Sequence, residues 1–213
     1  MTSIRTLTRR TALVVATATA ALALAACGGD GSGSGHGGHG SSSTGGGASA
    51  SAEATNGAHN AQDVAFAQGM IPHHQQALEM ARLAAERAGS AEVKDLATRI
   101  EKAQDPEIRT MTGWLKSWGE EVPKAMPGMD HSAHGGMSGM MSPQDMDKLE
   151  KASGKTFDTL FLTMMVEHHE GAVEMATTEK DKGAYGPAKA TAEDIVTAQN
   201  AEISEMNKLL GKD

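Results

Sequence analysis

Cysteine is almost absent from the chain, which has one, Cys27, among 213 residues. A single thiol excludes an internal disulfide and any metal site built from several thiolates. Aromatic residues are scarce too, with three Phe, two Trp and one Tyr. In contrast, the chain has 14 methionines and 9 histidines. Because thioether and imidazole are the soft and borderline metal ligands that remain without thiolates, this bias points towards metal binding.

The chain also lacks an apolar run long enough to be a clear membrane span. The run from Ala12 to Ala26 follows a basic start and ends in small residues directly before Cys27. It is shorter than the roughly 20 residues that a spanning helix needs. The pattern is typical of a bacterial lipoprotein signal. We therefore predict a signal peptide over residues 1–26, lipidation of Cys27 and an extracytoplasmic protein anchored to the cell membrane. General and twin-arginine export both stay open.

The chain also has fewer basic residues than acidic ones, with 19 Lys and Arg against 27 Asp and Glu. The formal net charge of −8 becomes −11 once the three arginines of the leader are removed. An acidic chain is a poor partner for nucleic acid and is compatible with cations. Residues 27–60 are rich in Gly, Ser and Ala, a composition typical of a flexible tether. We expect residues 61–213 to form the folded domain.

Within this domain, "MIPHHQQALEMA" at residues 70–81 has a counterpart, "MVEHHEGAVEMA", at residues 165–176. A shift of 95 residues superimposes the two phrases and continues into the segment that follows each. The pairs include Asp63/Asp158, Phe66/Phe161, Ile100/Ile195, Gln104/Gln199, Glu107/Glu202 and Met111/Met206. One constant offset over two segments indicates a duplicated unit that contains both of them.

Each repeat has the periodicity of a helical hairpin. Apolar residues recur at alternating spacings of four and three, which is the seam of a packed helix. We predict hairpins over residues 61–118 and 156–211, joined by a connection over 119–155 in which Ser142 caps a short helix. The fold class is all-α, a ferritin-like four-helix bundle of two tandem hairpins. The long connection leaves open whether the first helices of the two hairpins run parallel or antiparallel.

The repeated phrase supplies candidate metal ligands. They are His73, His74, Met70 and Met80 in the first repeat and His168, His169, Met165 and Met175 in the second. The second helix of each hairpin carries polar residues on or beside its apolar face, which we expect to support the ligands: Gln104, Glu107, Gln199 and Glu202. The alternative is that these methionines fill the core and the histidines are hydrogen-bonded core residues.

The connection contains a second set of candidate ligands. Residues 126–141 have no helical period but are rich in Gly, Met and His, and their candidate ligands are Met126, Met129, His131, His134, Met137, Met140 and Met141. Thioether sulfur suits Cu(I), and imidazole suits both Cu(I) and Cu(II). We predict that this Met/His loop binds copper in one or both oxidation states.

Through the repeated phrases and the hairpin after each, residues 60–211 resemble the bacterial family called "domain of unknown function 305". The resemblance implies a ferritin-like bundle in an exported protein, and some family members bind copper. It assigns Met70, His73, His74, Met80 and their counterparts in the second repeat to the shared motif. The Met/His loop is not part of that motif.

The sequence therefore favours a copper-binding protein that buffers, sequesters or delivers the metal and is not an enzyme. One alternative is a ferritin-like di-metal oxidase, but neither His-His pair has the Glu three residues earlier that such enzymes use. The other is a structural or interaction lipoprotein of the cell envelope that holds no metal. A copper-delivery partner and the oligomeric state stay open.

Overall fold

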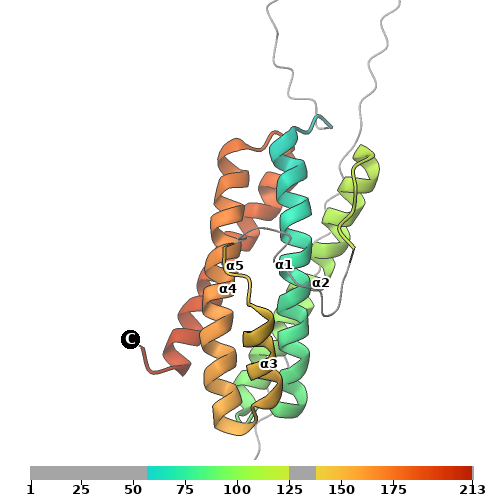
Figure 1. Cartoon of the computed structure of the whole chain (residues 1–213). Helices are drawn as coiled ribbons and strands as arrows, with labels where there is room; N and C mark the ends of the chain where they lie inside the picture. Colours follow the sequence, from blue (N-terminus) through green and yellow to red (C-terminus); the bar gives the residue numbers. More distant parts are fainter. Residues whose placement is uncertain (1–56, 125–137, 213) are drawn as a thin grey trace, which may run out of the picture. The chain divides into compact units, whose positions relative to one another are not determined.

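The computed structural model describes residues 57–124 and 138–212. Within these residues the chain forms five α-helices: α1 (Ala61–Arg87), α2 (Ala91–Trp118), α3 (Pro143–Lys151), α4 (Gly154–Lys182) and α5 (Gly186–Leu209). The four long helices form a bundle, and the short α3 lies beside it (Figure 1). This confirms the all-α four-helix bundle. None of the described helices is both long and apolar enough to cross a membrane. The predicted signal peptide, Cys27 and most of the tether fall outside the described residues.

Local capping explains where the helices begin. The side chain of Asn60 accepts hydrogen bonds from the amides of Gln62 and Asp63, which starts α1. Ser90 caps α2 in the same way, and Ser142 caps α3 through the amide of Asp145. These side chains satisfy amides that have no partner inside the first turn of a helix.

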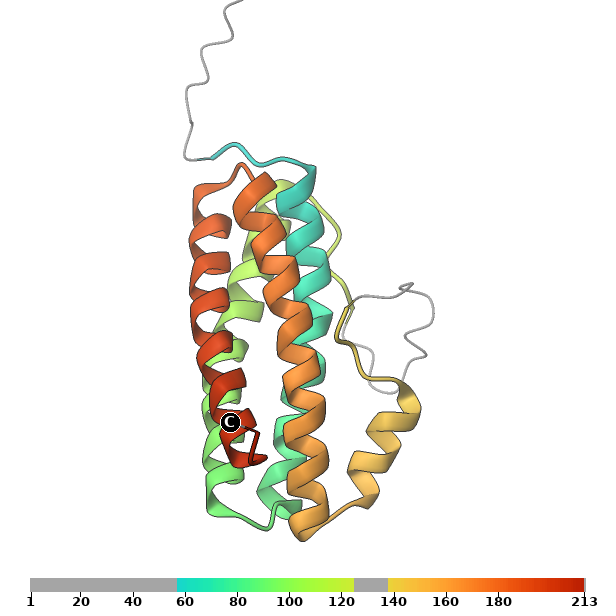
Figure 2. The same cartoon turned by 90° about the vertical axis from the view of Figure 1, so that its left-hand side faces the viewer.

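The central pair of helices, α1 and α4, runs antiparallel. The start of α1 lies at the end of α4, where the Asn60 amide donates to the Lys182 carbonyl over 2.9 Å. At the other end, Ala88 forms an isolated bridge with Gly154. Figure 2 shows α1 and α4 side by side in opposite directions. The long connection therefore brings the second hairpin back inverted, which settles the direction that the sequence left open.

Two aspartates fasten the hairpins to each other. The Asp158 carboxylate on α4 accepts from the amides of Gly89 and Ser90, in the turn between α1 and α2. The Asp63 carboxylate on α1 accepts from the amides of Ala184 and Tyr185, in the turn between α4 and α5. All three positions of the second contact lie 95 residues from those of the first. The repeat is thus a structural two-fold relation as well as a sequence one.

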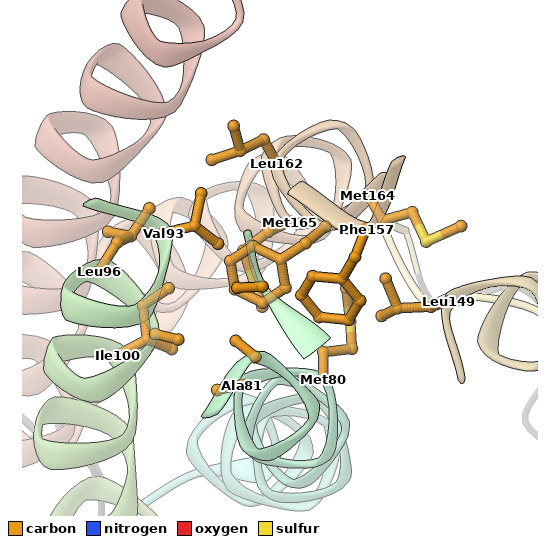
Figure 3. Close-up of a cluster of buried hydrophobic side chains, with 14 of the residues drawn as sticks. Met80, Ala81, Val93, Leu96, Ile100, Leu149, Phe157, Leu162, Met164 and Met165 are labelled. Carbon is orange, nitrogen blue, oxygen red and sulfur yellow. The ribbon is translucent and has the colours of Figure 1, made fainter. Parts of the chain in front are cut away.

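Two apolar clusters form the core. The first lies around the α1–α2 turn and includes Met80, Leu96, Phe157 and Met165 (Figure 3). Leu149 of α3 completes it, which explains why the short helix packs on the bundle. The second lies towards the α4–α5 turn and contains Phe66, Met70, Met111, Leu115, Ala172 and Ile195. Fully burying a Leu, Met or Phe side chain contributes about 1.5–3 kcal/mol, so these clusters dominate the stability of the bundle.

Candidate metal centre

A polar layer separates the two apolar clusters at the middle of the bundle. Each long helix contributes two side chains at this level: His73 and His74 from α1, Gln104 and Glu107 from α2, His168 and His169 from α4, and Gln199 and Glu202 from α5. The four histidines and both glutamines are buried. The eight residues form four pairs related by the repeat. At this layer α1 and α4 therefore contribute equivalent residues, and so do α2 and α5.

The rings of His73 and His168 face each other across the central helix pair. Their centroids lie 3.7 Å apart with an angle of 41° between the ring planes. This contact follows from the antiparallel packing of two mid-helix positions related by the repeat. The two side chains are only 0% and 1% exposed, so the pair is sealed inside the protein.

The neighbouring histidines point to carboxylates. His74 Nε2 lies 2.7 Å from Glu107 Oε2, and His169 Nε2 lies 2.7 Å from Glu202 Oε2. When the ring N–H donates to the carboxylate, Nε2 carries the proton and Nδ1 keeps its lone pair. The side chains of Glu107 and Glu202 are 24% and 17% exposed, so both carboxylates also reach the edge of the bundle.

Several buried nitrogen and oxygen atoms of the layer have no hydrogen-bond partner within residues 57–124 and 138–212. They are both ring nitrogens of His73 and of His168, Nδ1 of His74 and of His169, both amide atoms of Gln104, and Oε1 of Gln199. Leaving one buried polar group unpaired costs about 1–3 kcal/mol. So many in one layer, including at least one lone-pair nitrogen on each histidine, indicate a site made to receive a ligand.

The electrostatics of the central pair favour neutral imidazole. Burial, and then the neighbouring His74, lower the pKa of His73 to about 3. Burial, and then His73 itself, hold the pKa of His168 well below its usual value. Both rings are therefore unprotonated near neutral pH, which is the form that binds metals. A metal ion can therefore bind these rings without first displacing the second proton of an imidazolium.

The donor set is small. In the stretches 57–124 and 138–212, no group of three or more His, Cys, Asp or Glu side chains is gathered closely enough to hold a metal ion. A closed structural zinc site uses four such ligands in a tetrahedron. The layer instead offers imidazole pairs with unpartnered nitrogens, a donor type that suits copper.

The motif methionines do not collect around one point. Met70 lies in the second apolar cluster and Met165 in the first, so these equivalent residues fall on opposite sides of the polar layer. Met80 and Met175 are divided in the same way, and Met175 is only partly buried. The antiparallel packing of α1 and α4 is the reason, because residues that precede the histidines on the two helices lie in opposite directions.

Of the seven candidate ligands in the Met/His loop, the structure describes only Met140 and Met141. Met141 is buried in the first apolar cluster, and Met140 is partly exposed. The predicted ligands Met126, Met129, His131, His134 and Met137 lie outside the described residues.

The sequence reasoning missed Gln76 and Gly171, which hold the end of this loop against the bundle. They occupy equivalent positions of the repeat but differ in type. The available signal was the mismatch between Gln76 and Gly171, one of five mismatches between the two repeated phrases.

Comparisons with known proteins agree with this architecture. A family model described as domain of unknown function DUF305 matches residues 63–210. The chain is similar to the crystal structure of a DUF305 protein from Streptomyces coelicolor, with 35% identity, coverage of 71% of this chain and 93% of that one, and a TM-score of 0.63. It is also similar to a DUF305 fragment from Deinococcus radiodurans, with 33% identity, coverage of 72% and 98%, and a TM-score of 0.62.

A third similar structure is that of CopM in its Cu(II)-bound form. The identity is 36%, the coverage is 69% of this chain and 94% of that one, and the TM-score is 0.60. CopM has also been solved in Cu(I)-bound and silver-bound forms. A search of curated proteins found no match.

Proposed function

The chain belongs to the DUF305 family, and from that premise we propose that it is an extracytoplasmic, membrane-anchored protein that binds copper and buffers, sequesters or delivers it. The observation that carries the proposal is the buried pair of His73 and His168, whose ring nitrogens have no hydrogen-bond partner among the residues that the structure describes. The copper-bound forms of the similar protein CopM support the choice of metal.

In this proposal His73 and His168 bind the metal through their unpartnered nitrogens. Both repeats contribute one ligand, so the intact bundle is needed to form the site. Imidazole nitrogen suits both Cu(I) and Cu(II), and copper stands at the top of the affinity order among divalent metals for such donors. The burial that keeps these rings neutral also excludes water from the metal.

Glu107 and Glu202 have a supporting role. Each accepts a hydrogen bond from one histidine of the layer, which orients that ring and makes its other nitrogen a better donor. The charge of the two carboxylates also favours a cation in the layer between them. In this proposal His74 and His169, which the two glutamates orient, are additional ligands for the metal.

The Met/His loop and the lipid anchor extend the proposal beyond the described residues. Thioether and imidazole groups close together in sequence capture Cu(I) without a folded scaffold. A lipid on Cys27 would hold this capture segment and the bundle at the membrane surface, where copper enters and leaves the cell.

We propose binding rather than catalysis. A di-metal oxidase bridges its metals with carboxylates from several helices of the bundle. Here Glu107 and Glu202 each pair with one histidine and are partly exposed. That arrangement supports ligand orientation better than a bridged di-metal site.

The proposal is tested by titrating the mature chain with Cu(I) against a chromophoric chelator that competes for it. We expect the His73→Ala variant to lose affinity for one copper ion per chain. A matched variant at Gln75, next to the layer and partly exposed, should keep wild-type affinity. Purification with paired iron instead of copper would favour the oxidase, and an unchanged affinity in His73→Ala would contradict the bundle site.

A further inference from the structure

The segment that ends the Met/His loop lies directly over the buried histidine pair. Residues 138–141, called the strap below, run over the face formed by α1 and α4 before α3 begins (Figure 1). A Cβ added to Gly139 would lie 2.6 Å from the carbonyl oxygen of Glu167 and 3.0 Å from that of His168. The strap therefore rests on the α4 backbone at the level of the His168 ring.

One glutamine fastens the strap to α1. The Gln76 side-chain amide donates to the Met141 carbonyl over 3.0 Å, and the Met141 amide donates to Gln76 Oε1 over 2.8 Å. Both bonds are buried. Because a buried amide without partners is unfavourable, Gln76 favours the closed position of the strap.

Gly171 makes room for the strap on α4. A Cβ at this position would lie 2.0 Å from the Ser138 carbonyl oxygen, which is far closer than non-bonded atoms approach in proteins. Any larger side chain would therefore push the strap off the helix. Gly171 is buried in the middle of α4, where glycine lowers helix stability by roughly 1 kcal/mol relative to alanine. Its presence there is explained by the contact with the strap.

These two positions break the repeat. Gln76 and Gly171 are related by the shift of 95 residues, and each comes three residues after a histidine of the central pair. The histidines and the following alanines are identical in the two repeats. A single strap that crosses a two-fold axis cannot contact both helices in the same way, so it needs a hydrogen-bonding residue on one helix and bare backbone on the other.

The strap also touches the pair itself. The Ser138 backbone lies beside the His73 ring, although no hydrogen bond joins them. His73 and His168 are almost fully buried with the strap in place. For a metal ion to arrive, some part of this surface has to move. The strap is a covering segment outside the helices, and two hydrogen bonds from Gln76 hold it to α1.

We propose that the strap closes the access route to His73 and His168, and that Gln76 and Gly171 are the positioning residues that keep it closed. This inference rests on the proposed copper site. Copper reaches and leaves the pair when the strap lifts. Gln76 and Gly171, called the latch below, therefore set the rate of copper transfer in both directions. The equilibrium affinity depends instead on the histidines.

The test uses the mature chain with two latch variants and two matched controls. Gln76→Ala removes both hydrogen bonds to Met141, and its control is Gln75→Ala. Gly171→Ala places a Cβ against Ser138, and its control is Gly113→Ala on α2, where an added Cβ meets nothing within 4 Å. Because alanine favours the helix, Gly171→Ala is expected to fold even if Gln76→Ala does not.

Two measurements are made on each variant. Hydrogen exchange of the Met141 amide in the metal-free protein reports opening of the strap. NMR signals of the histidine rings, followed after Cu(I) is added or removed by a chelator, report copper at the central pair separately from other ligands. Losing two buried hydrogen bonds should raise the open population about tenfold or more.

We expect faster Met141 exchange in both latch variants, with loading and release each faster by roughly tenfold and the copper affinity changed by less than about threefold. The controls should match the wild type. Faster exchange with unchanged loading and release would overturn the strap as the access route. An affinity that does not respond to His73→Ala would overturn the copper site and this inference with it, and so the two failures are distinguishable.

Discussion

Glu179 on α4 is buried beside Asp63 on α1, so two carboxyl groups share one end of the central helix pair. Burial, and then the contact with Asp63, raise the pKa of Glu179 to about 8. Burial alone would raise the pKa of Asp63 too, but the neighbouring Glu179 carboxyl group and hydrogen bonds from nearby backbone amides lower it. The two groups divide their roles, because Asp63 binds the α4–α5 turn as a carboxylate while Glu179 keeps its proton at neutral pH.

This pair predicts a pH dependence of stability. The unfolded chain releases the Glu179 proton near its ordinary pKa of 4.5, whereas the folded protein keeps it until about pH 8. The Glu179 contribution to the free energy of unfolding therefore falls as the pH rises from about 4.5 to 8. The buried His73 and His168, whose pKa values are lowered from 6.5, contribute the opposite trend below about pH 6.5, so the total should fall between about pH 6.5 and 8. Glu179→Gln is neutral at every pH and should flatten this part of the profile, although it also loses the attraction to Lys189.

Urea unfolding of both proteins between pH 4 and 9 measures this effect. At pH 9 we expect Glu179→Gln to be more stable than the wild type. A wild-type profile that does not fall between about pH 6.5 and 8 would show that Glu179 ionises normally.

The central histidines should act as one site. His73→Ala and His168→Ala should each lower copper affinity by roughly tenfold or more, and the double variant should lose little beyond either single one, because the two rings share a metal. Each variant should remain folded, since removing a ring also removes two unpartnered buried nitrogens.

Met70→Ala is the stability control for these variants. Met70 is fully buried in the apolar cluster, and its truncation should cost about 2–5 kcal/mol of stability. Calorimetry and chelator competition on the same samples separate the two effects. If the histidine variants behave like Met70→Ala and keep their copper affinity, the pair is a packing element.

The carboxylate partners should tune the site without forming it. Glu107→Gln and Glu202→Gln each weaken the hold on a neighbouring histidine, and we expect copper affinity to fall by about 10- to 100-fold. Glu79→Gln changes an exposed carboxylate on α1 and controls for net charge. An equal loss of copper affinity in all three variants would show that the glutamates act through long-range electrostatics and not through their hydrogen bonds.

The aspartate contacts between the hairpins should hold the bundle together. Asp158→Ala leaves the amides of Gly89 and Ser90 without an acceptor and should destabilise the protein by about 1–2 kcal/mol. Thermal unfolding measures this loss. Asp181→Ala, near the end of α4, is a control that should change the melting temperature little, because no hydrogen bond involves that side chain among the described contacts.

The Met/His loop should bind Cu(I) by itself, because its ligands are local in sequence. A synthetic peptide of residues 126–141 should compete with a chelator for Cu(I) and should not bind Mg²⁺ or Ca²⁺, which prefer oxygen ligands. A peptide with no affinity for Cu(I) at millimolar concentration would leave copper binding to the bundle alone.

The sequence by itself determined the hairpins, their capping residues and the polar layer. Ser142 caps the short helix as predicted, because a cap depends only on the next few residues. The repeat offset of 95 also placed His73 and His168 at equivalent levels of two helices. Helical periodicity and short-range hydrogen bonding fix these features, and both can be read along one segment.

Only the tertiary structure decided how these parts meet. The antiparallel packing of α1 and α4 brings the two rings face to face and sends Met70 and Met165 to opposite clusters. The same packing puts Glu179 beside Asp63 and lays the strap between Gln76 and Gly171. These contacts join segments far apart in the sequence, and no local pattern fixes them, because the connection is long enough to return the chain in either direction.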